Sequence, residues 1–483
     1  MHDAESDDIA MPEIKNEHDN SNETTIDWQE DDSEHPRNWK TGRKWIQVVL
    51  LTLLTFMVQY GGSAYSSTET DIARDFDTSH ELAIAGISVL LLAYAVVPML
   101  LAPLAEVIGR VPLYLVGYFG FLCFTIPSAV TTDISVMIIF RFLAGCAGSV
   151  GNTMIGGSIT DMFEPAALGA PMTFYIVFGL LLSEPMGPLI NGFVVENPRL
   201  GYRWVFWFQI IFGFAILLVL FLKLEETRPS VLLQRRAAKM SKEKGTKMSA
   251  KGDDTPMSET IYSSLKMPWL LMFTDVTVAL FSLWLAFAWG LAYGMLQSIS
   301  LVFKTNHAFS ESQVGLVFVA LIAALAVGLV AAAIQELWFK RSNHKAGSFV
   351  PEGRLQIACI GSVCLSGGLF FYAWTSGRMV AAIVPMVAIG IVFFGIFTIY
   401  YAVFLYICDN YSDLASSALS AAGFWRNMFA AAFPLFIEIM YNRLGYQWAG
   451  STLAFISVPL GLIPFALVKF GPKVRANSKY IES

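Results

Sequence analysis

Long apolar stretches alternate with short polar breaks along this chain. Stretches such as Ile84 to Leu104 and Trp204 to Leu222 hold roughly twenty residues with few charges, enough for a helix to cross a hydrocarbon core of about 30 Å. A segment inside a bilayer must satisfy its backbone hydrogen bonds internally, so each stretch is predicted to be a helix. The pattern predicts an all-α membrane protein, and its function is expected to concern what crosses or enters the bilayer.

The predicted helices fall into two groups of six. A polar break rich in Lys and Arg, from Glu225 to Pro268, follows the sixth stretch. We therefore expect two six-helix halves, residues 45–223 and 270–470, joined by a cytoplasmic central loop at residues 224–269. The twelve spans are expected at residues 45–65, 82–104, 113–131, 134–158, 169–194, 204–223, 270–300, 312–338, 355–375, 379–407, 413–436 and 447–470.

Charge is scarce and unevenly distributed. Charged residues make up 14% of the chain, whereas soluble domains carry about 25%. Residues 1–36 hold thirteen Asp or Glu and only one Lys, and such a segment has little apolar surface to bury. We expect a disordered acidic tail at residues 1–44 and a short C-terminal tail at residues 471–483. The remainder is net basic, as cationic cytoplasmic loops require, and no nucleic-acid partner is implied.

The Lys and Arg residues also predict the orientation in the membrane. Cations flank the first span, fill the central loop, and follow the eighth and twelfth spans, whereas the loop from Glu69 to Glu81 is acidic. Because cytoplasmic loops carry an excess of Lys and Arg, both termini are predicted to be cytoplasmic. The glycosylation sequons at Asn22 and Asn410 would then face the cytosol and remain unmodified.

Four short motifs lie at defined places along the predicted spans. They are EHPRNW at residues 34–39, APLAEVIGR at residues 102–110, RFLAG at residues 141–145 and GPLING at residues 187–192. In this order they resemble the motifs of the major facilitator superfamily and, within it, of fungal drug:proton antiporters with twelve spans. The chain departs from that pattern at Ala102, at Val111, and at Ser183 and Glu184, which stand where relatives usually carry Gly-Pro.

The resemblance implies a secondary transporter rather than an enzyme. A protein of this kind would export a small organic solute, such as an organic acid, a secondary metabolite or a drug-like compound. It would do so by proton antiport and alternating access, as a monomer in the plasma membrane and without a cofactor. An importer or uniporter of the same fold is the alternative, because the change at Ser183 and Glu184 weakens the link to export. A non-transporting receptor is disfavoured by the short C-terminal tail.

The resemblance also assigns conformational roles. The loop with Glu106, Gly109 and Arg110 is expected to act as a latch whose charges pair in one conformation and separate in the other. A solvated turn with a weak ion pair is the simpler alternative. In the fifth span, small residues allow close helix contact and prolines kink the helix, so this span is expected to be the hinge. The hinge residues are Pro185, Gly187, Pro188 and Gly192.

Three ionisable side chains lie deep in predicted spans: Arg141, Glu184 and Arg426. Charges inside a membrane are costly and usually mark a substrate or proton pathway, so all three are candidates for proton coupling or solute contact. Glu184 is either the proton carrier, a salt-bridge partner of Arg141 or Arg426, or a protonated structural residue.

The two arginines leave further alternatives open. Arg141 and Arg426 come from opposite halves, and together they favour a site that attracts anions. Alternatively, backbone carbonyls satisfy Arg141, and Asp409 or Asp413 neutralises Arg426.

Five further polar residues are candidates for lining the cavity. They are Gln59, Tyr60, Gln297, Tyr400 and Tyr401. A Gly-x-x-x-x-Gly-Lys-Ser/Thr loop is missing, so an ATP motor within the chain is not expected. The six histidines form no pairs at metal-ligand spacing, so no metal site is expected. The five cysteines are expected to be buried thiols.

Overall fold

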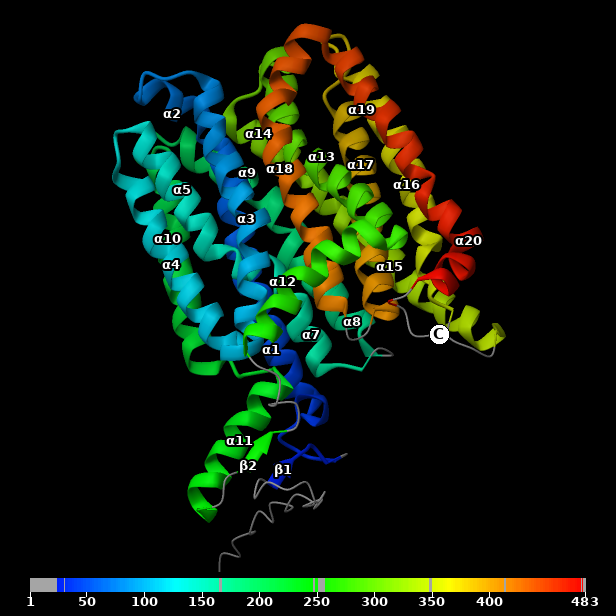
Figure 1. Ribbon diagram of the computed structural model, residues 1–483. Coiled ribbons are helices and arrows are strands. Elements are labelled where there is room, and N and C mark those ends of the chain that lie inside the picture. Colours follow the sequence, from blue (N-terminus) through cyan, green and yellow to red (C-terminus); the bar gives the residue numbers. More distant parts are fainter. Residues whose placement is uncertain are drawn as a thin grey trace, which may run out of the picture.

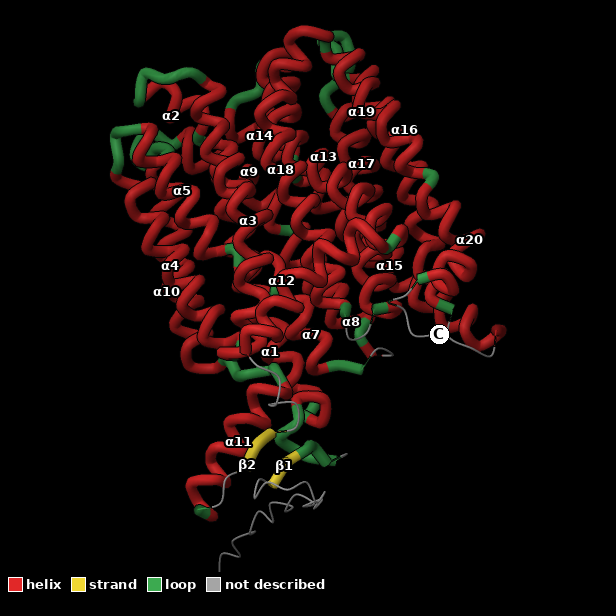
Figure 2. The backbone as a smooth tube through the Cα atoms, viewed as in Figure 1, coloured by secondary structure: helices red, strands yellow, loops and turns green. Residues whose placement is uncertain are grey.

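The computed structural model describes residues 24–29, 31–164, 167–245, 248–250, 257–346, 350–411, 414–478 and 480. The described chain is a bundle of long helices (Figure 1), with one two-stranded sheet outside it (Figure 2). Ten described helical segments are long and apolar enough to cross a membrane. Large apolar side chains such as Val116, Phe221 and Phe273 are exposed on the outside of the bundle, as expected where lipid surrounds a protein.

The first half contains six membrane-spanning helices, of which the fourth and fifth are divided into consecutive segments. They are α1 (Thr41–Ser63), α3 (His80–Ile108), α4 (Arg110–Val130), α5 to α7 (Ile134–Gly148, Val150–Thr153 and Ile155–Met162), α8 with η4 and α9 (Gly169–Phe174, Tyr175–Leu181 and Ser183–Glu196), and α10 (Arg203–Lys223). The short segments η2 (Ala64–Ser67) and α2 (Glu69–Asp75) connect α1 to α3.

The second half also contains six. They are α13 (Val276–His307), α14 with α15 (Glu311–Val317 and Val319–Ala346), α16 (Gln356–Thr375), α17 (Ile383–Asn410), α18 (Ala415–Leu444), and α19 with α20 (Tyr446–Gly461 and Ile463–Asn477). The segment η5 (Pro351–Leu355) precedes α16. The predicted fold of twelve helices in two halves is confirmed.

The seventh span begins later than predicted. The Asp275 carboxylate accepts hydrogen bonds from the backbone N–H groups of Thr277 (2.9 Å) and Val278 (3.1 Å), which caps α13 and separates it from α12 (Met257–Thr274). An aspartate at this position is a strong N-cap because it satisfies donors that the helix leaves open. The apolar run continues across this break, so hydropathy alone placed the start of the span at residue 270.

The described part of the N-terminal tail is ordered, in contrast to the prediction for residues 1–44. Strand β1 (Thr24–Ile26) pairs in parallel with β2 (Met248–Ala250), and η1 (Pro36–Asn38) leads into α1. The central loop is also folded, because α11 (Pro229–Lys244) precedes β2. A small apolar cluster of Ile26, Leu233, Ala237 and Ala250 joins the two segments. The prediction missed this packing because the tail is acidic on average. Residues 1–23, including Asn22, lie outside the described residues.

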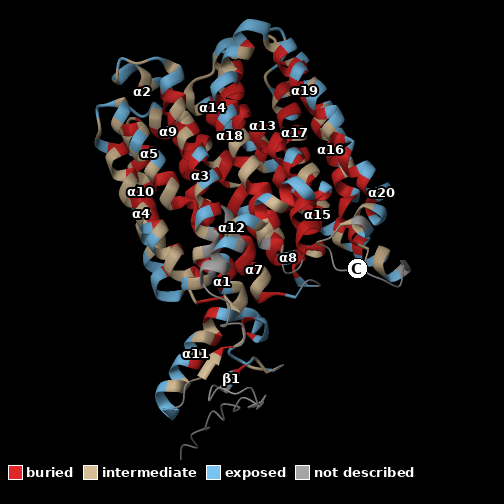
Figure 3. Ribbon diagram, viewed as in Figure 1, coloured by how far each residue is buried: buried red, intermediate tan, exposed pale blue. Residues whose placement is uncertain are grey.

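The two ends of the bundle differ, and we name them by their helices. The α11 end carries α11 and the start of α1, and the α2 end carries α2 and the start of α14 (Figure 1). The buried residues lie where the helices face one another (Figure 3). The halves meet where α3 packs against α18 and where α9 packs against α14. Polar side chains buried along these contacts are therefore the place to look for a site.

Candidate functional site

The fifth span changes its helical type just before Glu184. Segment η4 is a π-helix, and the N–H of Leu182 bonds the carbonyl of Val177 at 2.8 Å, an i to i+5 contact. Such wide turns are rare and occur mostly at functional sites. The wide turn comes directly before Ser183 and Glu184, where the sequence departs from the resembled pattern.

The predicted hinge residues lie at close helix contacts. A Cβ atom on Gly187 would lie 2.2 Å from the Ser63 hydroxyl oxygen, within the first half. A Cβ atom on Gly192 would lie 2.5 Å from the backbone carbonyl oxygen of Glu311, which belongs to the second half. Pro185 and Pro188 lie on the same helix, α9. Glycine at 192 is thus what lets the two halves touch at the α2 end; whether the helix bends stays a prediction.

Replacing Gly192 with alanine should therefore obstruct closure of the α2 end. The added methyl group would overlap the Glu311 carbonyl, and a backbone atom cannot move aside as a flexible side chain can. We expect solute flux to fall sharply while the purified protein still elutes as a folded species in size-exclusion chromatography. Gly367→Ala is the matched control, since no atom lies within 4 Å of its added Cβ. Equal flux in the two variants would contradict the assignment.

Glu184 is buried between the halves without an ion-pair partner among the described residues. Its side chain is on α9, and the residue is 1% exposed. Tyr293 of α13 acts on it as a hydrogen-bonding group and Arg426 of α18 acts on it through its charge, and both belong to the opposite half. The alternative of a salt bridge from Glu184 to Arg141 or Arg426 is not observed in the described structure.

Arg141 is held mainly by backbone carbonyls. Its Nε donates to the carbonyl of Gly86 and its Nη1 to that of Gly61, each at 3.1 Å, and its guanidinium lies 4.3 Å from the centre of the Tyr65 ring. Among the described residues Nη2 has no hydrogen-bond partner. The interpretation of Arg141 as a structural residue thus accounts for two of its nitrogen atoms and leaves the third unexplained.

Arg426 connects the two halves. It donates to the hydroxyl of Tyr400 within the second half and to the Oδ1 atom of Asn152 in the first half, the latter at 2.9 Å. The proposed neutralisation by Asp409 is wrong, because Asp409 accepts a hydrogen bond from Arg354 at 2.8 Å. The other proposed partner, Asp413, lies outside the described residues.

Several other buried polar atoms have no partner among the described residues. They belong to Gln59 (both amide atoms), Trp289 (Nε1), Asn427 (Oδ1) and Arg426 (Nε). Leaving a buried polar group unbonded costs about 1–3 kcal/mol, and native proteins rarely tolerate it without water or a ligand. We call Arg141, Glu184, Tyr293 and Arg426 the central cluster, because Tyr293 acts on both Arg141 and Glu184, and Arg426 acts on Glu184. The unbonded nitrogen atoms of its two arginines are suited to hold a polar solute or water.

The predicted cavity residues do not lie together. Gln59 is buried on α1 with both amide atoms unbonded among the described residues, and Tyr400 bonds Arg426 of the central cluster. Tyr60 instead accepts a hydrogen bond from Asn191 at 2.9 Å within the first half. Gln297 bonds Glu69 at the α2 end, and Tyr401 donates to Glu336 at the α11 end (3.0 Å). Spacing along a helix could not distinguish these positions, because all five face the protein interior.

The predicted latch is part of a larger ionic network at the α11 end. Arg110 binds Asp161 at 2.8 Å and the Ser158 hydroxyl at 3.0 Å. Gly109, with φ +99°, provides the left-handed turn before α4. Nothing is described of the Glu106 side chain, so its pairing stays a prediction.

Glu226 completes this network and was not predicted. One carboxylate oxygen accepts from the N–H groups of Arg110 (3.2 Å), Thr227 (3.1 Å) and Arg228 (3.1 Å), and the other from Val111 (3.2 Å). Placing a carboxylate at the first turn of α4 satisfies open donors and favours the helix dipole. The sequence offered only an acidic pair, Glu225 and Glu226, after the sixth span.

Removing the Glu226 carboxylate should destabilise the first half. Hydrogen bonds to a charged acceptor contribute about 1.5–3 kcal/mol, so Glu226→Ala is expected to lower the unfolding free energy by at least that much. The measurement is the Tm of the purified protein, which should fall by several degrees. Glu225→Ala is the matched control because its carboxylate is 41% exposed and pairs with Arg43 at the surface, where ion pairs contribute little. Equal Tm values would show that the cap is unimportant.

A second ionic network occupies the corresponding place in the second half. Arg354 contacts both Glu336 and Asp409, and Tyr401 donates to Glu336. Gly169, at the start of α8 in the first half, lies against Glu336, because a Cβ atom there would be 2.5 Å from its Oε1. Each half therefore has its own network at the α11 end, and the two halves meet beside the second.

At the α2 end, polar contacts join the two halves directly. Gln297 donates from Nε2 to both carboxylate oxygens of Glu69, each at 2.8 Å, and His80 lies 3.2 Å from Glu438. Burial raises the pKa of Glu69, which lies outside the spans in α2, to about 8. The sequence missed Glu69, because its position in an acidic loop suggested contact with solvent.

The family follows from the sequence profile of the Major Facilitator Superfamily, which matches residues 51–434. The chain belongs to the major facilitator superfamily. Its central cluster therefore lies between the two halves of a membrane transporter.

Named efflux pumps and transporters align along most of the chain. The efflux pump radE of Floropilus chiversii is 34% identical over 462 residues, which cover 94% of this chain and 85% of radE. The efflux pump atB of Aspergillus terreus is 37% identical over 393 residues (79% and 82%), and the multidrug transporter mdrA of Aspergillus fumigatus is 32% identical over 464 residues (94% and 75%). The predicted resemblance to fungal transporters of this superfamily is confirmed.

Solved structures support the same fold. The proton:xylose symporter XylE matches with a TM-score of 0.64 at 13% identity, covering 89% of this chain and 97% of XylE. XylE from E. coli in a partially occluded inward-open conformation matches with a TM-score of 0.58 at 13% identity. At this identity the likeness concerns the arrangement of the superfamily's helices alone.

Proposed function

We propose that this protein exports a small organic solute by proton antiport and alternating access. The relatives named as efflux pumps and a multidrug transporter support export. The observation that carries the proton part is Glu184, a carboxylate buried between the halves that has no ion pair among the described residues and that Tyr293 and Arg426 approach from the opposite half. Secondary metabolites, organic acids and drug-like compounds are the proposed cargo classes.

The central cluster is where we place both solute and proton. The free Nη2 of Arg141 and Nε of Arg426 offer hydrogen bonds to an acidic or polar solute, while Trp289 and Tyr293 offer aromatic surface with a polar edge. A buried carboxylate binds a proton readily because burial disfavours its charged form. Binding of a proton to Glu184 and binding of a solute beside Arg426 would then exclude each other.

Alternating access fits the distribution of contacts. The ionic network of Arg110, Asp161 and Glu226 lies within the first half, and that of Glu336, Arg354 and Asp409 lies within the second. Each half can therefore move as one body. The polar contacts of Glu69 with Gln297 and of His80 with Glu438 at the α2 end cross between the halves, so they are suited to break and reform as the central cluster is exposed to either side.

The proposed orientation places the α11 end in the cytosol of a cell whose plasma membrane holds the protein as a monomer. Lys and Arg are concentrated on α11, beside the start of α1 and on α20, which supports this orientation. Impermeant labelling of single cysteines at exposed positions Lys242 on α11 and Glu81 on α3 tests it. We expect Glu81→Cys alone to react in intact cells.

Transport direction and coupling are tested in reconstituted vesicles. Protein in proteoliposomes is given an imposed pH gradient and a panel of acidic, neutral and cationic solutes. Antiport predicts that at least one solute accumulates on the acidic side as protons leave that side. If the pH gradient alters the flux of no transported solute, a uniporter is favoured. If a solute accumulates on the alkaline side, toward which the protons flow, an importer is favoured.

A further inference from the structure

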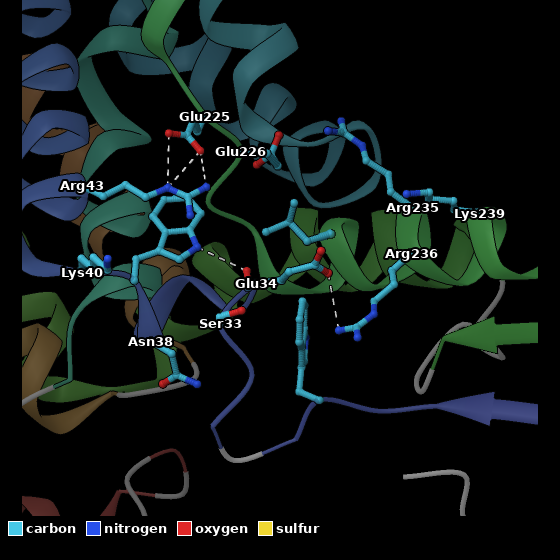
Figure 4. A pocket seen from close by; sticks show the side chains of 13 residues that line it. Ser33, Glu34, Asn38, Lys40, Arg43, Glu225, Glu226, Arg235, Arg236 and Lys239 are labelled. Carbon is cyan, nitrogen blue, oxygen red and sulfur yellow. Dashed lines mark hydrogen bonds and ion pairs between the residues drawn. The ribbon is translucent and has the colours of Figure 1, made fainter. Parts of the chain in front are cut away.

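A cavity of about 920 Å³ lies outside the helical bundle, at the α11 end. One wall is the N-terminal segment that enters α1, and the other is α11 with the residues just before it (Figure 4). Its volume lies within the range of small-molecule sites. Neither the central cluster nor the contacts between the halves involve this cavity.

The cavity is lined by more cationic than acidic side chains. The five cationic residues of the lining are Lys40, Arg43, Arg235, Arg236 and Lys239. Arg43 pairs with Glu225, and Arg236 pairs with Asp32 and Glu34. The remaining three have no ion pair among the described residues.

The third acidic residue of the lining is already engaged. The Glu226 carboxylate accepts four backbone N–H groups, as described above. The acids present are therefore bonded, while Lys40, Arg235 and Lys239 remain available for an added anion.

The walls are held in place by packing rather than by loose loops. The pairing of β1 with β2 and the apolar cluster of Ile26, Leu233, Ala237 and Ala250 join the two segments. Arg43 lies 4.0 Å from the Trp39 ring. Arg235 and Lys239 are one turn apart on α11, so both project from the same face of that helix. The cations are thus presented from two directions toward one space.

We propose that this cavity binds a phosphate monoester, the chemistry shared by a phosphoinositide headgroup and a soluble organic phosphate. Guanidinium groups present paired N–H donors that match phosphate oxygens, and lysines add compact charge. Lys40 is the residue directly before α1, which begins at Thr41, so the cavity lies at the level where lipid headgroups are expected. Basic clusters next to a membrane span bind such headgroups.

Calorimetric titration of the full-length purified protein tests the site. The probes are short-chain phosphatidylinositol bisphosphate, inositol trisphosphate as its free headgroup, and short-chain phosphatidylcholine. We expect the first or both of the phosphorylated inositol probes to bind and phosphatidylcholine not to bind. Binding of the lipid alone identifies a membrane source, and equal binding of the free headgroup identifies a soluble one.

Charge-removal variants locate the binding. The triple variant Lys40→Gln, Arg235→Gln, Lys239→Gln should weaken binding about 100-fold, at roughly fivefold for each cation. A matched triple variant removes Lys223, Lys242 and Lys473, which are exposed and do not line the cavity. Three results would overturn the proposal. They are undiminished binding in the first triple variant, an equal loss of binding in both triple variants, and no binding of any phosphorylated probe.

Discussion

Glu184→Gln is expected to abolish proton-driven accumulation of solute while leaving the fold intact. Glutamine has nearly the shape of glutamic acid but cannot exchange a proton. One pH unit corresponds to a factor of ten in proton activity, so a gradient of about two units could sustain about a 100-fold solute gradient at one proton per solute. In the variant that ratio should fall to one, with downhill exchange of solute retained.

The measurement is solute accumulation in proteoliposomes with an imposed pH gradient. Glu243→Gln is the matched control, because Glu243 is exposed on α11 and far along the chain from the central cluster. Accumulation at wild-type levels in Glu184→Gln would remove this residue from proton coupling. Loss of downhill exchange as well would indicate that the carboxylate binds solute rather than protons alone.

The second large effect is expected from Glu69 at the α2 end. Its pKa is raised, chiefly by burial, to about 8 while the halves touch, and it should return to an ordinary carboxyl value near 4.5 when they separate. Closing this end therefore takes up a proton between about pH 4.5 and pH 8. The closed form is favoured most below pH 4.5, and the advantage is lost as the pH rises through 8.

Other charged groups surround Glu69 and belong to the same contact. His80 comes from α3, Lys304 from α13 and Glu438 from α18, while Gln297 donates to Glu69 directly. Their charges set the size of the effect, which approaches tenfold per pH unit for a single group. Glu69→Gln should keep a hydrogen bond with Gln297 and lose most of the pH dependence.

Distance measurements between spin labels test this directly. The labels are placed at the exposed positions Glu81 and Asn442, one in each half near the α2 end, after removal of the five native cysteines. The short-distance population should grow as the pH falls from 8 to 5 in the parent protein and stay constant in Glu69→Gln. An unchanged pH response in the variant would assign the effect to His80 and Glu438 instead.

The sequence was sufficient for the membrane fold because a twenty-residue apolar run has few interpretations. It was insufficient where a few residues act against the local average. The acidic tail contains Ile26 and Trp39, which are buried, and the apolar run around residue 270 contains the helix cap Asp275. Because such predictions average the composition over many residues, they do not detect a single buried residue or a single helix cap.

The site was predictable only in its individual charges. Deep arginines and a glutamate stand out in apolar helices, so Arg141, Glu184 and Arg426 could be named. Their partners could not, since Asn152 and Arg426 are 274 positions apart and meet only after folding. Glu69 and Glu226 were missed because acids beside a span suggest solvent exposure, whereas packing of the halves and of the linker buries both.

The central claim is that the buried polar cluster faces a passage that opens to each side in turn. Labelling of a single cysteine at Tyr293 with a membrane-impermeant thiol reagent, applied from either side of oriented vesicles, tests it most directly. We predict that the cysteine reacts with reagent applied from either side. Conditions that promote the reaction from one side should suppress the reaction from the other side. Protection from both sides under every pH and solute condition, or simultaneous reaction from both, would contradict it.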